Sequence, residues 1–124
     1  MSFKEIIDQE IAKKILQGAI KEKRLAHAYL FTGPAGVGKW FTAIELAKAV
    51  NCLKEGDDYC GECSSCKKIS HLIHPDLTLI FPLPPVSSSK KGRKEKEEEE
   101  QKNRNKFIQE KLANPYRIVR YEKP

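Results

Sequence analysis

The sequence has no long hydrophobic run. None of its apolar stretches approaches the ~20 residues that a membrane-spanning helix needs, so we expect no membrane partner. The first ten residues, MSFKEIIDQE, place acidic side chains where a secretory signal would need an uninterrupted apolar core. The predicted location is therefore cytoplasmic.

The chain is also short and contains no internal repeat. Its 124 residues suffice for one domain with a single core, but they are few for an enzyme that needs several separate catalytic elements. A hydrophobic content of 40% with 32% charged residues fits a globular protein that carries a solvated segment. The net charge of +6 permits contact with nucleic acid, but solubility alone explains it equally well.

The first half of the sequence predicts a helix, a strand and a second helix. Apolar residues at helical spacing follow Asp8, the expected N-cap, and predict an amphipathic helix over residues 9–23. The run HAYLF, residues 27–31, ends at a glycine-rich turn and predicts a buried parallel strand. A second helix is expected from Lys39 onward. The predicted apolar faces are Ile11, Ile15, Leu16, Ala19 and Ile20 in the first helix, and Trp40, Ala43, Ile44, Ala47 and Val50 in the second, with Glu45 and Lys48 outside the latter face.

A further strand is predicted after the second helix. A short helix is expected to end near His74, because Pro75 disfavours helical backbone before it. The run DLTLIFP, residues 76–82, carries the apolar and β-branched side chains of a core strand. The alternation of helices and strands predicts an α/β domain with a parallel sheet over residues 1–83.

The composition changes in the last third of the chain. Residues 84–112 are a charged insertion with no apolar side chain between Val86 and Phe107, so they cannot build a core. We expect a solvated segment, helical in part from about Glu97 to Leu112 or disordered, with a DNA-binding or partner-binding arm as the alternative. Residues 113–124 resemble the start of the next strand, and the abrupt end favours a truncated chain.

The stretch GPAGVGK matches the phosphate-loop pattern G-x-x-x-x-G-K, between a predicted strand and a predicted helix. Its glycines let backbone N–H groups surround phosphate oxygens, and the helix N-terminus adds about half a positive charge. Lys39 would reach the β- and γ-phosphates. A glycine-rich turn without a ligand is the alternative. The predicted nucleotide-binding residues are Gly33, Pro34, Ala35, Gly36, Val37, Gly38 and Lys39.

The residue after the lysine departs from the pattern. Working members of this class place a serine or threonine there, whose hydroxyl binds the magnesium ion, but this chain has Trp40. An indole offers only an N–H donor and cannot coordinate a cation. Thr42 is rotated by about 200° along the helix and is not expected to replace the missing hydroxyl. No acidic residue ends a second apolar strand, apart from Glu122 after a weak one, so no catalytic residue is assigned.

Four cysteines form the pattern C-x7-C-x2-C-x2-C, with Gly61 available for a tight turn. Without an export signal, this grouping argues against disulfides and favours tetrahedral zinc bound by four thiolates. Four protein ligands close the coordination shell, so the predicted site is structural. A redox pair or inert thiols are the alternatives. His71 and His74 are not included. The predicted zinc ligands are Cys52, Cys60, Cys63 and Cys66.

These stretches together resemble a known family. HAYLFTGPAGVGK, AIELAKAVNC and CGECSSCKKISHLIHPDL, in this order, are similar to the N-terminal ATPase domain of bacterial DNA polymerase III clamp-loader subunits, gamma/tau and delta-prime. The resemblance covers Ile6 to about Phe81. It is specific because a phosphate loop rarely occurs with a four-cysteine module that a His-Pro-Asp step closes. Residues 84–112 lie outside it and look like a lineage-specific insertion.

The resemblance implies an AAA+ P-loop NTPase fold with a zinc module inserted at residues 52–66. It also implies partners, namely the other subunits of a hetero-pentameric loader, the sliding clamp and primer-template DNA, and the task of opening the clamp and loading it at primed sites during replication. In that family gamma/tau is the motor, and delta-prime is a stator that supplies an arginine finger. That finger lies beyond Pro124, and neither Arg117 nor Arg120 is assigned to it.

Two departures from the family pattern favour delta-prime over gamma/tau. Family motors keep a threonine at the position of Trp40, whereas delta-prime members tolerate a degraded loop. The family also shows glycine at the position of Asp8, in the step that touches adenine. We therefore expect weak binding of ATP or ADP and weak or absent hydrolysis. A gamma/tau-type ATPase and, from another class, a standalone zinc-dependent interaction module or phosphate-binding switch are the alternatives.

Overall fold

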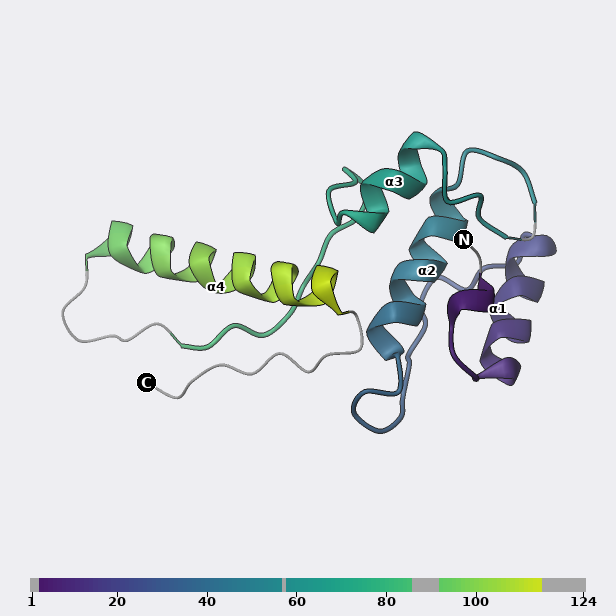
Figure 1. The fold of residues 1–124 in the computed structure, drawn as a ribbon, viewed down its shortest axis with the longest axis horizontal. Coiled ribbons are helices and arrows are strands. Elements are labelled where there is room, and N and C mark those ends of the chain that lie inside the picture. Colours follow the sequence, from purple (N-terminus) through teal and green to yellow (C-terminus); the bar gives the residue numbers. More distant parts are fainter. Residues whose placement is uncertain (1–2, 57, 86–91, 115–124) are drawn as a thin grey trace. The chain divides into compact units, whose positions relative to one another are not determined.

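Helices make up the regular structure in this computed structural model, which describes residues 3–56, 58–85 and 92–114. The chain divides into two units, Met1–Leu77 and Thr78–Pro124. No helix in these described ranges is long and apolar enough to cross a membrane. The elements are the 3-10 turn η1 (Phe3–Glu5) and the helices α1 (Glu10–Lys21), α2 (Lys39–Asn51), α3 (Ser64–Ser70) and α4 (Arg93–Ala113) (Figure 1).

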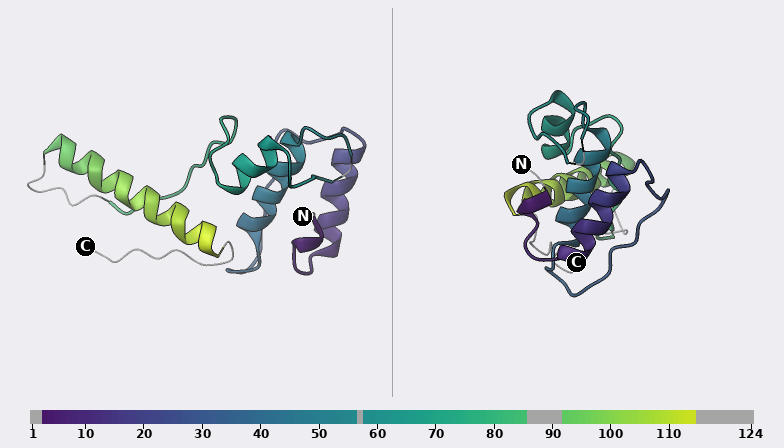
Figure 2. Two further views of the ribbon diagram at one scale, coloured as in Figure 1. Left: turned by 45° about the horizontal axis from the view of Figure 1, so that its top comes forward. Right: turned by 90° about the vertical axis from the view of Figure 1, so that its right-hand side faces the viewer.

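The core of the first unit lies among three helices. Helices α1 and α2 are side by side, and α3 packs at the C-terminal end of α2 (Figures 1 and 2). Tyr59 and Cys66 belong to the cysteine segment, residues 52–66, and both are buried in this core. The cysteine segment therefore shares one core with the helices. The buried apolar residues of this cluster are Phe3, Ile6, Leu16, Leu46, Tyr59 and Cys66, and Ile69 of α3 is buried as well.

Helix α1 differs from its prediction at its start and on its face. Its N-cap is Gln9, without a side-chain cap bond. The prediction of Asp8 as the N-cap is wrong by one residue: the helix begins at Glu10, and Asp8 and Gln9 both have left-handed backbone (φ 55° and 59°). Leu16 is buried as predicted, but Ile11 and Ile15 are 78% and 61% exposed. One edge of the predicted apolar face therefore packs on the core.

Helix α2 buries the residues that its sequence pattern placed outside. Glu45 and Lys48 are 0% and 5% exposed, whereas Val50 is 51% exposed, so the predicted face is wrong. The physical reason is a buried ion pair: the Lys48 Nζ donates to the Glu45 Oε1 at 2.8 Å. The Lys48 ammonium also lies 5.3 Å from the centre of the Tyr59 ring. Both contacts compensate part of the cost of burying these charges.

The described residues contain no β-strand, so the predicted parallel sheet is not seen among them. The segments 27–31 and 76–82 have no regular secondary structure. Leu30 is 88% exposed and Ile80 is 91% exposed, although both were expected to be buried in strands. A strand is defined by the neighbour with which it pairs, and neither segment has such a neighbour in the described ranges. The sheet therefore stays a prediction.

The second unit contains α4. The helix predicted from about Glu97 begins at Arg93 and ends at Ala113, one residue after the predicted end. It has no buried residue, but Phe107 stacks on Phe81 with ring centres 3.9 Å apart. The guanidinium of Arg104 lies 5.2 Å from the centre of the Phe81 ring. The predicted further strand, with Arg117, Arg120 and Glu122, falls almost wholly outside the described residues.

Candidate metal centre and phosphate loop

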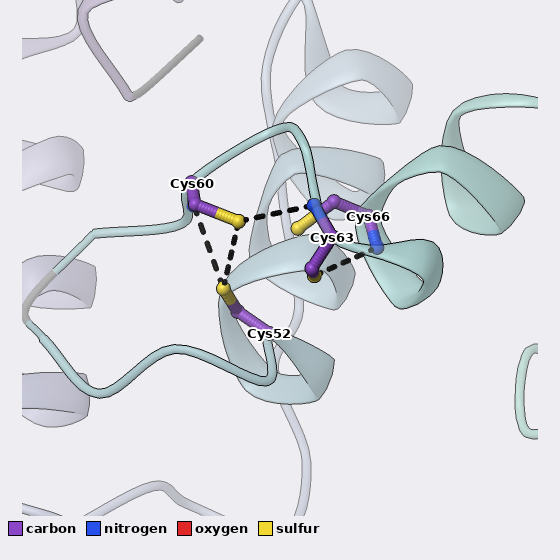
Figure 3. A group of neighbouring side chains, drawn as sticks. All are labelled: Cys52, Cys60, Cys63 and Cys66. Carbon is purple, nitrogen blue, oxygen red and sulfur yellow. Dashed lines mark hydrogen bonds between the residues drawn. The ribbon is translucent and has the colours of Figure 1, made fainter.

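The four cysteines come together from three elements. Cys52 caps the C-terminus of α2, Cys63 caps the N-terminus of α3, Cys66 lies in the first turn of α3, and Cys60 lies on the loop between these helices. Their sulfur atoms point toward one another (Figure 3) and all lie within 4.8 Å of each other. This four-cysteine cluster could bind a metal ion.

The spacing of the sulfur atoms fits a tetrahedral ion. Zinc–sulfur bonds of ~2.3 Å place two tetrahedral ligands about 3.8 Å apart, and the Cys52 and Cys60 Sγ atoms are 3.6 Å apart. The widest sulfur pair would have to close by about 1 Å from its limit of 4.8 Å. Cys60 lies on a loop and Cys63 at a helix end, so these two sulfur atoms can move without repacking a helix interior.

Backbone amides prepare the sulfur atoms for a cation. The Cys63 N–H donates to the Cys60 Sγ at 3.3 Å, and the Cys66 N–H donates to the Cys63 Sγ at 3.5 Å. Gly61 makes this tight turn possible with φ 72°. Hydrogen bonds from the backbone of Leu53 and then of Cys66 lower the pKa of Cys63 to about 6. They stabilise a thiolate, which is the form that binds metal.

Cys66 has the opposite environment. It is buried in the core, and this burial raises the pKa of its thiol to about 12. A thiolate at this position is therefore stable only beside a cation. The donor set therefore contains one thiol, Cys63, with a lowered pKa and one thiol, Cys66, whose ionisation depends on the metal.

The neighbouring histidines lie outside the cluster. The ring of His74 uses both nitrogens, since its Nε2 lies 2.9 Å from the Ser65 Oγ and its Nδ1 accepts the Asp76 N–H at 3.1 Å. His74 therefore holds α3 to the turn that follows it. His71 is exposed at the C-cap of α3.

The phosphate loop lies at the opposite end of α2 from Cys52. Gly38 is the N-cap of α2 and takes φ 101°, a conformation that favours glycine. The Lys39 Nζ donates to the carbonyl oxygens of Gly33 (2.7 Å) and Pro34 (3.0 Å). In this arrangement the lysine ammonium is bonded to the loop's own backbone. A phosphate would have to compete with both carbonyls for it.

A cavity of about 70 Å³ lies beside the loop. It is smaller than the ~300 Å³ at which pockets for drug-sized ligands begin. Lys39 and Thr42 both line it, together with Gln9 and Phe31. Thr42 is 7% exposed, and it lies one turn after Lys39 on α2. Trp40 is half-buried in the first turn of the same helix. A bound nucleotide would require this cavity to widen.

Comparison with known proteins shows the family of this chain. The model of the family described as "DNA polymerase III, delta subunit" matches residues 8–121. The chain belongs to this family. The match confirms the predicted resemblance to the clamp-loader subunits of DNA polymerase III. No solved structure gives a significant match.

Several curated relatives of this delta-subunit family member are named as DNA polymerase III subunits. The chain is 43% identical over 83 residues to the DNA polymerase III subunit delta' of Bacillus subtilis, a region that is 66% of this chain and 25% of that protein. It is 46% identical over 70 residues to subunit tau of the same organism, which is 56% of this chain and 12% of that protein. Protein STICHEL-like 1 of Arabidopsis thaliana is 46% identical over 68 residues, 53% of this chain and 6% of that protein. The chain thus spans a quarter or less of these relatives.

The sequence analysis of this family member did not identify Asp58 and Tyr59, the two residues before Cys60, as structural contacts beside the cysteine cluster. Tyr59 precedes Cys60 and is 3% exposed, and its ring contacts Phe3 edge-on at 5.9 Å between ring centres. Asp58 accepts the Phe3 N–H at 3.2 Å. A tyrosine amid the polar residues of GDDYCGEC was the available signal for a buried anchor.

Proposed function

We propose that this chain is the phosphate-loop portion of a delta-prime-like clamp-loader subunit of DNA polymerase III. Such a subunit helps to open the sliding clamp and load it onto primed DNA, and its own ATP hydrolysis is weak or absent. The observation that carries this proposal is the state of the phosphate loop. Trp40 stands where a magnesium-binding hydroxyl is needed, and the Lys39 ammonium is engaged with the carbonyls of Gly33 and Pro34.

The chemistry of the loop supports a stator better than a motor. A nucleotide must displace two hydrogen bonds of Lys39 before the lysine can reach its phosphates. Magnesium would then lack its first protein ligand, because an indole cannot coordinate it. Residues 33–39 therefore serve as a fold element or a weak site for ATP or ADP. No catalytic residue is proposed.

We further propose that Cys52, Cys60, Cys63 and Cys66 hold a structural zinc ion. The zinc would supply a four-fold cross-link and no reaction, since four thiolates close its shell. This cross-link would tie the C-terminal end of α2 to the N-terminal end of α3.

The assembly follows from the same proposal. The partners are the other clamp-loader subunits in a hetero-pentamer, the sliding clamp and, through the complex, primer-template DNA in the cytoplasm. Residues 1–83 would form part of an AAA+ domain, in which segments 27–31 and 76–82 join a parallel sheet. Residues 84–112 would be an insertion, and residues 113–124 would begin the next strand.

A gamma/tau-type ATPase is the second candidate. The observation that favours it is the identity of 46% to the Bacillus subtilis tau subunit. In that case a group other than residue 40 would complete the magnesium shell. The phosphate-loop pattern up to Lys39 is the same in both candidates.

Calorimetry of nucleotide binding separates the two candidates. ATP is titrated into the wild type, Trp40→Thr and Trp40→Phe, each with and without magnesium. For the delta-prime-like function, binding to the wild type is weak and independent of magnesium, and Trp40→Thr restores a magnesium-dependent gain. Trp40→Phe is the matched control, because it reduces bulk without supplying a hydroxyl. Tight, magnesium-dependent binding to the wild type would reject the stator.

A further inference from the structure

The first unit contains a second, larger groove, which shares Cys52 with the four-cysteine cluster and no described residue with the phosphate loop. It encloses about 530 Å³ between the C-terminal end of α1 and the loop that follows α2. This lies within the ~300–1,000 Å³ of pockets that hold ligands. Its apolar lining is Ile20, Ala49 and Leu53. Leu53 is 70% exposed, so the groove presents apolar surface to solvent.

The charged lining of the groove is mostly positive. Among the described residues, Lys21, Lys23 and Lys54 line it, together with one carboxylate, that of Glu55. Lys54 also lies 3.8 Å from Glu62, but both side chains are largely exposed, and such a pair is weak. Three ammonium groups around an aliphatic surface are complementary to carboxylates that flank an apolar side chain.

We propose that this groove binds an acidic peptide segment of a partner protein, with one apolar side chain between its carboxylates. The apolar side chain lies against Ile20 and Leu53, and the carboxylates pair with the lysines. A nucleic acid fits less well, because none of the described lining residues is an aromatic one that could stack on a base, and because Glu55 repels phosphates. Cys52 also lines the groove, so an occupant covers one side of the metal centre. Only this last point rests on the proposed zinc site.

The test uses the full zinc-treated chain and three fluorescein-labelled peptides. Asp-Asp-Leu-Asp-Asp is the probe, Asp-Asp-Ala-Asp-Asp lacks the apolar anchor, and Asn-Asn-Leu-Asn-Asn lacks the charge. Fluorescence anisotropy should give a Kd below about 1 mM for the leucine peptide, up to about tenfold weaker binding for the alanine peptide, and no measurable binding for the asparagine peptide. Raising the salt concentration should weaken the leucine peptide.

Groove variants locate the binding. Lys23→Ala should weaken the leucine peptide about two- to fivefold, and Leu53→Ser should weaken it about tenfold. Lys14→Ala is the matched control: it removes an exposed lysine of α1 that does not line the groove, and it should change nothing. Circular dichroism verifies that each variant is folded. Amide chemical shifts should change at Ala49 and Gly56, in the groove lining.

Four results would overturn the proposal. They are no binding of the leucine peptide, equal loss with Lys14→Ala, tighter binding of a thymidine tetranucleotide than of the peptide, and self-association that Leu53→Ser abolishes. Zinc is measured in the same samples by mass spectrometry. If the chain binds the peptide but retains no zinc, only the proposed metal site is refuted. If the chain retains zinc but does not bind the peptide, only the proposed peptide-binding groove is refuted.

Discussion

Replacing Lys48 should lower the folding stability of the first unit more than any substitution of a surface residue. Lys48→Met leaves the Glu45 carboxylate, which is 0% exposed, without its ammonium partner. Breaking a buried ion pair in this way costs about 3–5 kcal/mol, a large part of the ~5–15 kcal/mol that stabilises an ordinary domain. The free energy of unfolding at pH 7 should therefore fall by several kcal/mol.

The pH dependence of this loss has a definite sign. Burial raises the pKa of Glu45 above its ordinary value of 4.5, Lys48 opposes that rise, and the carboxylates of Glu5 and Asp58 add to it. A carboxyl group with a raised folded-state pKa favours folding below pH 4.5, and it loses that contribution as the pH rises through the folded-state value. In Lys48→Met the rise is larger, so the destabilisation should grow with pH by up to about 1.4 kcal/mol per unit.

A double variant distinguishes the net contribution of the Glu45–Lys48 ion pair from the cost of leaving one charge unpaired. The Glu45 Oε2 has no hydrogen-bond partner in the described structure, so the pair carries an uncompensated cost. Glu45→Leu with Lys48→Met removes both charges and should be within about 1 kcal/mol of the wild type, or more stable. The matched control is Lys13→Met, because the Lys13 to Glu10 pair has the same i,i+3 spacing at 3.0 Å but its carboxylate is 71% exposed. That control should cost about 1 kcal/mol or less.

Urea unfolding followed by circular dichroism, between pH 4 and pH 8, measures these differences. A Lys48→Met variant that loses no more stability than Lys13→Met would refute this role of the buried ion pair. A double variant as unstable as the single one would refute it as well, because the loss would then come from the contact of the lysine with Tyr59 rather than from the unpaired Glu45 carboxylate.

Three further outcomes follow from the structure. Zinc loading at pH 7 should release more protons from Cys66, with a pKa of about 12, than from Cys63, with a pKa of about 6. Calorimetry in two buffers measures the proton release. The Cys66→Ser variant should retain no zinc in metal analysis. Asp8→Gly should raise the unfolding free energy by up to about 1 kcal/mol, since Asp8 has φ 55°, and a loss in urea unfolding would contradict that backbone. Phe107→Ala should lower the helical dichroism of α4 more than Leu112→Ala, because only Phe107 stacks on Phe81, a contact worth about 0.5–1.5 kcal/mol.

Local patterns made the phosphate loop and the cysteine cluster predictable. Gly38 and Lys39 are fixed by the turn that opens a helix, and the cysteines from Cys60 to Cys66 lie within two turns of chain. Glycine, lysine and cysteine at these spacings are typical of phosphate loops and metal sites. The spacing alone therefore predicted which residues would lie close together.

Long-range contacts defeated the prediction elsewhere. Helical periodicity placed Lys48 outside the core because nothing in α2 itself shows that Tyr59 will lie within 5.3 Å of its ammonium. The state of segments 27–31 and 76–82 depends on strand partners, which no periodicity specifies. The orientation of the Lys39 side chain onto the loop carbonyls is likewise a three-dimensional fact, and the motif alone suggests the opposite direction.

Helix α2 fixes the distance between the phosphate loop and the four-cysteine cluster. It has 13 residues, with the last glycine of the phosphate loop as one cap and the first cysteine of the metal cluster as the other, and so holds them about 20 Å apart. Inserting or deleting a single residue within it would turn Cys52 by about 100° around the helix axis and displace it by about 1.5 Å. Either change would carry one thiol out of the cluster. Length polymorphism among natural variants should therefore be tolerated in the loop after Cys52 and be absent from α2.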